Sequence, residues 1–262
     1  MPMDYVFSTL AMGFKVSTLI MGAMFFSGGM WAQALSTGQQ EGAERKGYAA
    51  LPGTRYMTFW SDVKQLVAED VNPLSDVFVH DRISDVTERV SVDSDGNPGN
   101  GDSRNAAISD NGRFVAFESE SDNLVFADHN GHSDIFLHDR ESGITTRVSV
   151  DDAGFEANGD SIAPVISRDG RYVAFESGAT NLQRGVTASG WGVYVHDRLT
   201  MTTFRAHLNI AGPTAVESGY RRINDVVLLD DHTIALEVDL GDGRFNVPVR
   251  VDAAGWQRSA AT

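Results

Sequence analysis

One seven-residue motif recurs three times in this 262-residue chain, with small variations and at a constant spacing. The copies read DVFVHDR at 76–82, DIFLHDR at 134–140 and GVYVHDR at 192–198, which defines a 58-residue period. A second phrase, GRFVAFES at 112–119, returns one period later as GRYVAFES at 170–177. A period of this length indicates one supersecondary unit that is repeated and stacked on its neighbours. The repeat therefore constrains the architecture before any local prediction is made.

Each period has the pattern of four short strands, separated by turns rich in Gly, Asn, Asp and Ser. In the second copy we expect strands at 106–108, 113–118, 134–140 and 145–150. No window shows sustained helical spacing of apolar residues. Alternate residues of the third strand point to opposite faces, and large side chains occupy both sets of positions. Sheets that are covered on both faces are typical of blades stacked around an axis.

About four periods fit into the part of the chain that follows position 34. We therefore predict an all-β propeller, with four blades of four antiparallel strands in a single domain over residues 35–262. The expected blades cover residues 46–92, 104–150, 162–208 and 220–262. Residues 35–45 would pair with the last blade and close the ring, because an open sheet edge invites aggregation. The alternative is an open or dimer-closed array of the same blades.

Residues 1–34 are predicted to be a signal peptide. An apolar run at 16–31 follows Lys15, and the tripeptide Ala-Gln-Ala at 32–34 fits the small-residue rule for cleavage after Ala34. The run is shorter than the roughly 20 apolar residues that span a bilayer, which favours cleavage over a membrane anchor. We expect a periplasmic or secreted protein without membrane insertion after cleavage.

Composition excludes several classes of function. The formal net charge of −15 disfavours nucleic acid as a partner, because phosphates require a basic surface. The absence of cysteine excludes disulfides, thiolate catalysis and cysteine-bound zinc. No G-x-S-x-G, H-E-x-x-H or phosphate-binding glycine motif is present.

The repeat resembles a known family. The patterns S-x-D-G-R-[YF]-V-A-F-x-S, S-D-[VI]-F-[VL]-H-D-R and T-x-R-V-S-V are similar to the TolB-like, WD-repeat-like propeller repeats of exported bacterial proteins. The resemblance covers residues 47–208 well and residues 209–262 poorly. It implies a propeller fold but no particular activity, because such repeats accompany many functions.

The repeated His-Asp-Arg triplet suggests a catalytic base beside a carboxylate. Adjacent residues of a strand point to opposite faces, however, so His138 and Asp139 would not form a dyad. One copy in each blade is typical of a structural network that satisfies neighbouring turns. We therefore expect a structural role for the three copies, which are His80, Asp81, Arg82, His138, Asp139, Arg140, His196, Asp197 and Arg198.

The long loops of each blade are expected on one rim, opposite the triplets. Long loops on a rigid scaffold commonly bind ligands, and these are acidic. The expected binding face contains Asp93, Asp95, Asp102, Asp122 and Asp160. We predict a monomeric binding or scaffold module that recognises a protein or polysaccharide of the cell envelope or exterior. The alternative is a carbohydrate-active hydrolase or lyase that uses carboxylates.

Calcium is the one cofactor that the loops suggest. Asp128, Asn130 and Asp134 offer oxygen ligands around the turn at Gly131, as hard cations require. The alternative explanation is that these side chains cap backbone amides in a solvated turn, which is the more common use of Asp and Asn in such turns. The pattern is therefore compatible with calcium and does not require it.

Overall fold

The computed structural model describes residues 46–49, 54–64, 66–67, 72–183, 190–206, 222–230, 233–239 and 244–250. Contacts divide the chain into the units 1–39 and 40–262, and every described residue belongs to the second. The predicted signal peptide and the predicted closing segment at 35–45 both lie outside the described residues. The described part of the chain contains no helix, and hence none that could cross a membrane.

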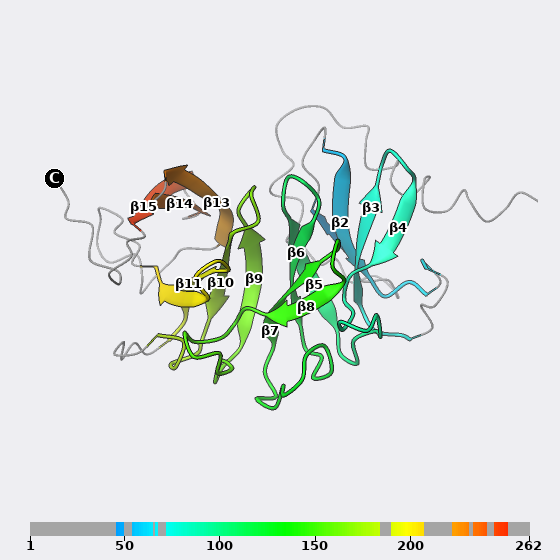
Figure 1. The fold of residues 1–262 in the computed structure, drawn as a ribbon, viewed down its shortest axis with the longest axis horizontal. Helices are drawn as coiled ribbons and strands as arrows, with labels where there is room; N and C mark the ends of the chain where they lie inside the picture. Colours follow the sequence, from blue (N-terminus) through cyan, green and yellow to red (C-terminus); the bar gives the residue numbers. More distant parts are fainter. Residues whose placement is uncertain are drawn as a thin grey trace, which may run out of the picture. The chain divides into compact units, whose positions relative to one another are not determined.

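Four antiparallel sheets follow one another along the chain (Figure 1). The first sheet contains β1 (Lys46–Ala49), β2 (Tyr56–Ser61), β3 (Asp76–Asp81) and β4 (Val86–Arg89). The second contains β5 (Ser103–Ile108), β6 (Phe114–Ser119), β7 (Asp134–Asp139) and β8 (Ile144–Arg147). The third contains β9 (Ser161–Ile166), β10 (Tyr172–Ser177), β11 (Gly192–Asp197) and β12 (Thr202–Arg205). The fourth contains β13 (Arg222–Asp230), β14 (Thr233–Asp239) and β15 (Arg244–Arg250).

Strands that are neighbours in sequence are neighbours in every sheet, which is the meander of a propeller blade. The all-β prediction is confirmed, and four-stranded antiparallel sheets recur with the sequence period in the first three repeats. The expected strand at 145–150 is shorter than predicted, since β8 ends at Arg147. Val150 forms an isolated bridge to Glu156 instead, where the chain turns toward the next sheet.

The register places the long connections at one end of each sheet. In the second sheet, Ser103, Ser119 and Asp134 lie opposite one another. The connections 120–133 and 148–160 both begin or end close to this row. We call this end of the sheets the loop rim. The opposite end is closed by short turns, and there Asp139 pairs with Ile144 across the strands.

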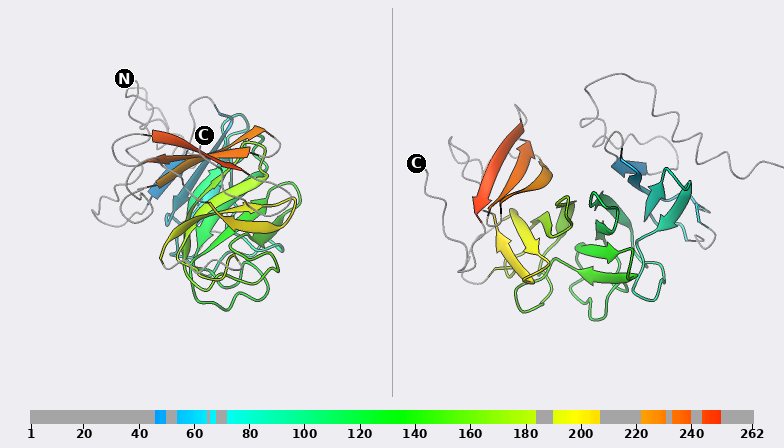
Figure 2. Two further views of the ribbon diagram at one scale, coloured as in Figure 1. Left: turned by 90° about the vertical axis from the view of Figure 1, so that its left-hand side faces the viewer. Right: turned by 45° about the horizontal axis from the view of Figure 1, so that its top comes forward.

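Both faces of the second sheet are buried, because the first and third sheets pack against it. One apolar cluster includes Val79, Phe117 and Phe136 and joins the first and second sheets. Another includes Leu137 and Phe175 and joins the second and third. The second and third sheets lie side by side in all the views (Figures 1 and 2). Their contact carries the candidate site.

An aromatic ring of the first sheet contacts the second sheet, and an equivalent ring of the second sheet contacts the third. The guanidinium of Arg140 lies 4.8 Å from the ring centroid of Tyr56, in the preceding sheet. A Cβ added at Gly112 would lie 2.1 Å from the same ring, so only glycine permits this approach. One period later, Arg198 lies 3.8 Å from the ring centroid of Phe114. Each of these two rings therefore packs against a glycine of the following sheet, Tyr56 against Gly112 and Phe114 against Gly170.

Candidate functional site

The aspartate of each His-Asp-Arg triplet is a hub for the turn-side end of its sheet. Asp139 accepts hydrogen bonds from Arg113 Nε at 2.7 Å and from Arg113 Nη2 at 2.8 Å. It also accepts bonds from the Glu141 amide and the Ser142 hydroxyl in the following turn. Asp81 and Asp197 bind arginine in the same bidentate way. These hydrogen bonds hold the pKa of Asp139 well below its usual range.

The histidine and arginine of the triplet have structural partners as well. His138 Nδ1 lies 2.9 Å from Thr145 Oγ1, and His196 Nδ1 lies 2.9 Å from Thr203 Oγ1. Burial lowers the pKa of His196 to about 4, so this imidazole is neutral at pH 7. Arg140 donates to Glu88 and to the Gly112 carbonyl oxygen. The triplets thus tie strands, turns and sheets together, at the end of the sheet away from the long loops.

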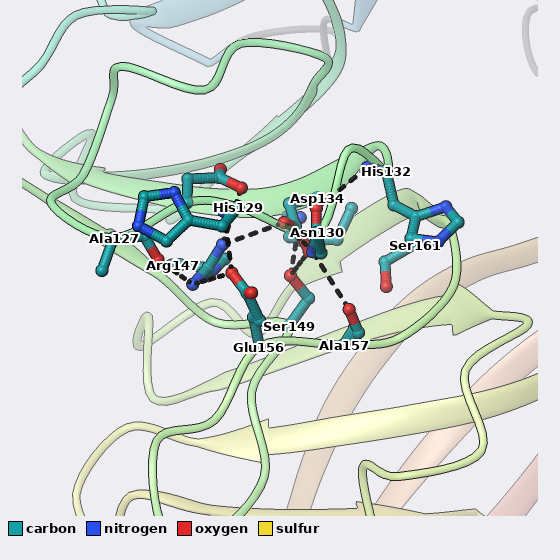
Figure 3. A network of polar contacts seen from close by, with 12 residues as sticks. Ala127, His129, Asn130, His132, Asp134, Arg147, Ser149, Glu156, Ala157 and Ser161 are labelled. Atoms are coloured by element: carbon teal, nitrogen blue, oxygen red, sulfur yellow. Dashed lines mark hydrogen bonds and ion pairs between the residues drawn. The ribbon is translucent and has the colours of Figure 1, made fainter.

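Asn130 and Asp134, two of the three candidate calcium ligands, lie together at the loop rim (Figure 3), and the third, Asp128, shares the guanidinium of Arg147 with Asp134. Asn130 Nδ2 donates to Asp134 Oδ2 at 2.7 Å and to the Ala157 carbonyl oxygen at 3.0 Å. Arg147 Nη1 lies 3.0 Å from Asp128 Oδ1 and 3.2 Å from Asp134 Oδ2. The guanidinium of Arg147 therefore supplies positive charge to both aspartates, which the sequence offered either as calcium ligands or as caps of backbone amides. No group of three or more His, Cys, Asp or Glu side chains among the described residues could hold a metal.

Arg147 also joins two loops. Its Nη2 donates to the Ala127 carbonyl oxygen at 3.1 Å and lies 3.0 Å from Glu156 Oε2 (Figure 3). The side chain of Arg147 is only 8% exposed. Asp128 Oδ2 is buried without a hydrogen-bond partner among the described residues, and burial raises the pKa of Asp128 to about 6. We call these four side chains, Asp128, Asp134, Arg147 and Glu156, the Arg147 cluster.

The expected acidic binding face does not form a single site. Asp93 caps its own turn and accepts from the backbone N–H groups of Asp95 and Asn97 at 2.9 and 2.8 Å. Asp102 accepts from the Ser75 amide at 2.9 Å and so joins the first and second sheets. Asp95 is exposed in the turn that Asp93 caps. These three aspartates are not among the residues that line the hollow at the loop rim.

A hollow of about 480 Å³ opens at the loop rim where the second and third sheets meet. Two of the five expected aspartates, Asp122 and Asp160, line it. The other lining residues come from both sheets and from the connection 120–133. They are Arg104, Glu118, Glu120, Gly131, His132, Ser133, Ile162 and Trp191.

The floor of the hollow is formed by the carboxylate of Glu118, and both of its oxygens accept hydrogen bonds. Glu118 is 4% exposed and accepts from Arg104 Nε at 2.9 Å and from Asn105 Nδ2 at 2.8 Å. Its Oε2 also accepts from the Ala163 amide of the third sheet at 3.1 Å. Arg104 pairs in addition with Glu120. The floor is thereby rigid and spans the contact between the two sheets.

The walls of the hollow are more exposed than its floor. Asp160 Oδ1 accepts from His132 Nδ1 at 2.9 Å and from the Ser133 amide at 3.2 Å. The Asp160 side chain is 54% exposed, and Trp191 is 46% exposed. A Cβ added at Gly178 would lie 3.5 Å from the indole, so the Trp191 ring rests against this glycine. The result is an accessible aromatic surface beside accessible carboxylates.

Sequence reasoning missed the two residues that distinguish this hollow, Arg104 and Trp191. Neither is repeated, since Ile162 stands one period after Arg104 and Ser133 stands one period before Trp191. A search for departures from the repeat would have found both. That the two residues line one hollow at the contact between two sheets could not be predicted from the sequence.

No protein-family model matches the sequence, and no curated protein matches it. Solved structures do show likenesses in fold. A TolB protein of Agrobacterium tumefaciens aligns with a TM-score of 0.39 and 13% identity, over 75% of this chain and 62% of that one. A prolyl endopeptidase aligns with a TM-score of 0.43 and 15% identity, over 84% of this chain and 28% of that one.

The β-propeller domain of the Trilobed protease from Pyrococcus furiosus aligns with a TM-score of 0.36 and 12% identity. The alignment covers 75% of this chain and 55% of that one. This chain therefore spans less than two thirds of each of the three proteins. Likenesses of this size say nothing about activity, so the proposals below rest on the side chains of the hollow.

Proposed function

We propose that the chain is an exported binding module, which recognises a protein or a glycan at the loop rim between the second and third sheets. The observation that carries this proposal is the hollow, with its rigid floor and its exposed carboxylates and indole. Concave sites with a few convergent polar groups and an aromatic wall are typical of ligand recognition. Its volume of about 480 Å³ is also in the range of ligand pockets.

The alternative function, a carbohydrate-active hydrolase or lyase that uses a pair of carboxylates, has less support than binding. A general acid or base needs a carboxyl group that can exchange a proton with the substrate. Both oxygens of Glu118 are occupied by donors from Arg104, Asn105 and Ala163. Glu120 is paired with Arg104. Two of the four carboxylates that line the hollow are therefore engaged in holding its floor together, and this observation favours binding.

The proposed scaffold is a propeller of four blades. The fourth sheet has the strands β13, β14 and β15 among the described residues, one fewer than each preceding sheet. We assign the remaining place to residues 35–45, which would close the ring. Deleting residues 35–45 should then lower the free energy of unfolding or promote association. An unchanged monomer of unchanged stability would contradict this closure.

The binding function is tested with the purified chain on arrays of glycans and peptides. Trp191→Ala should abolish any binding that the wild type shows, because it removes the aromatic wall. Leu199→Ala is the matched control, since Leu199 is 74% exposed in a turn at the opposite end of the third sheet. Binding that survives Trp191→Ala, or equal losses in both variants, would contradict a site at the loop rim. A turnover screen on the same ligands separates binding from catalysis.

A further inference from the structure

Two carboxylates in the walls of the hollow each keep an oxygen for a ligand. Asp160 receives its hydrogen bonds at Oδ1, and Asp122 Oδ1 accepts from Asn100 Nδ2 at 2.6 Å. In the part of the chain that the structure describes, no donor bonds to Oδ2 of either aspartate. Both side chains are exposed, so a donor from outside can reach these oxygens. The free acceptors point to a ligand that donates hydrogen bonds.

The charge of the hollow is one-sided. Four carboxylates line it, from Glu118, Glu120, Asp122 and Asp160, against the single guanidinium of Arg104. The carboxylates therefore outnumber the guanidinium by three among the Asp, Glu and Arg side chains that line the hollow. Such a site attracts cations and repels acidic polysaccharides and phosphates. The charge thereby selects among the ligands that the proposed function allows.

Trp191 adds a surface that suits a cation. The exposed face of an indole attracts ammonium and guanidinium groups more strongly than other aromatic rings do. The backbone of Trp191 is held by Arg205, whose Nη2 donates to the Trp191 carbonyl oxygen at 3.2 Å. The ring itself rests on Gly178. Stacking on a ring that is already fixed costs little conformational entropy.

Two further aromatic side chains indicate the size of the partner. Phe126 is fully exposed and Phe155 is 66% exposed, on the two connections that also border the hollow. The residues next to them, Ala127 and Glu156, are both held by Arg147. The two rings are therefore displayed from a braced framework. A small amine in the hollow would leave them uncovered, whereas a protein surface would cover them.

We infer, on the basis of the binding function proposed above, that the hollow takes the cationic end of a lysine or arginine side chain from a basic segment of a partner protein. Asp122 and Asp160 accept its hydrogen bonds, and Trp191 stacks on its alkyl stem or its charged group. Phe126 and Phe155 contact apolar residues of the same segment. The net charge of −15 steers such a segment toward the chain.

The test uses an acetylated and amidated heptapeptide, Gly-Lys-Leu-Gly-Lys-Leu-Gly, in isothermal titration calorimetry. The matched probe is the same peptide with both lysines acetylated, which removes the charge and keeps the size. Spermine represents a small polyamine, and a neutral hexasaccharide represents a glycan. Asp160→Asn and Trp191→Ala test the hollow, and Asp95→Asn is the charge-matched control on the same rim. Thermal unfolding verifies that all variants fold.

We expect the wild type to bind the basic peptide and to show no binding of its acetylated form. Asp160→Asn and Trp191→Ala should each raise the dissociation constant about tenfold, which corresponds to about 1.4 kcal/mol, while Asp95→Asn leaves it unchanged. Equal weakening by Asp95→Asn would reduce the effect to general charge and overturn the inference. Tighter binding of spermine than of the peptide would overturn the protein partner, as would no peptide binding at 1 mM. Hexasaccharide binding that depends on Trp191 would refute the inference and leave the proposed function standing.

Discussion

The guanidinium of Arg205 occupies the place where a side chain at Gly192 would begin. A Cβ added to Gly192 would lie 2.4 Å from Arg205 Nε. In the second sheet the equivalent arginine, Arg147, faces Asp134 at 3.2 Å, and in the first sheet Arg89 faces Asp76 at 3.3 Å. Arg205 is only 8% exposed, and its Nη1 has no hydrogen-bond partner among the described residues. The third repeat therefore has glycine in place of the aspartate and retains the arginine.

Gly192→Asp should therefore stabilise the protein. The new carboxylate would restore the buried ion pair that the first two repeats have, because a buried guanidinium is stabilised by a carboxylate that compensates its charge. We expect the free energy of unfolding to rise by about 1 kcal/mol, or the melting temperature by about 2–4 °C. Gly192→Ala is the control, because it adds the Cβ without the charge and should destabilise. A loss of stability in both variants would show that Arg205 cannot move aside.

Gly112→Ala should cost far more than Gly143→Ala. Both glycines have positive φ, +74° and +73°, so the backbone strain of the two substitutions is matched. At Gly143 nothing lies within 4 Å of an added Cβ, whereas at Gly112 the ring of Tyr56 lies 2.1 Å away. We expect about 1 kcal/mol for Gly143→Ala from strain, and about 2 kcal/mol more for Gly112→Ala from overpacking. Urea unfolding measures both, and equal losses would contradict the ring lock between the sheets.

Asp128 should make the protein more stable as the pH falls from 7 to 5. Its folded pKa of about 6 lies above the usual 3.8, so the folded state binds the proton more tightly. This contribution is complete below pH 3.8 and disappears as the pH rises through 6. The advantage of the wild type over Asp128→Asn should grow by about 1 kcal/mol between pH 7 and pH 5. A constant difference across this range would show that Asp128 is ionised throughout.

His196 should make the protein less stable as the pH falls from 7 to 5, which is the opposite of the effect of Asp128. Its folded pKa of about 4 lies below the usual 6.5, so the unfolded chain binds the proton more tightly. The stability that neutral His196 provides is complete above pH 6.5 and is lost as the pH falls toward 4. Relative to His196→Asn, the wild type should lose about 2 kcal/mol between pH 7 and pH 5.

His196→Asn keeps a polar group near Thr203 Oγ1 and removes the titration. His129→Gln is the control, since it removes an exposed histidine and leaves the buried His196 in place. Urea unfolding at a series of pH values distinguishes the two. The same loss in all three proteins would place the acid sensitivity elsewhere.

The repeat predicted the local structure well, because strand, turn and register information is carried by neighbouring residues. The constant period located the four sheets, and the turn glycines marked their ends. The clustering of Asp128, Asn130 and Asp134 was also local and was predicted. The contact of Arg147 with these aspartates was not predicted. Arg147 reaches them through the pairing of β7 with β8 and is distant from them along the chain.

The hollow was harder to predict for a physical reason. Its floor depends on a bond from the Ala163 amide in the third sheet to Glu118 in the second, and no periodicity specifies such a bond. Asp122 and Asp160 were expected on the loop rim, but Asp93 and Asp102 were expected there too and are used for caps. An aspartate on a long loop can cap an amide or face a ligand. Only the arrangement of the sheets separates the two uses.

The contact of an arginine in one sheet with a ring in the sheet before it also bears on how this chain could have arisen. Arg140 and Tyr56, and then Arg198 and Phe114, are the same head-to-tail contact one period apart. The second sheet thus carries one half of the contact on each side, the arginine toward the first sheet and the ring toward the third. Arg82 occupies the corresponding position in the first sheet, without a sheet before it in the described chain. A repeat that is copied together with its arginine and its ring therefore brings its own contact with the sheet before it.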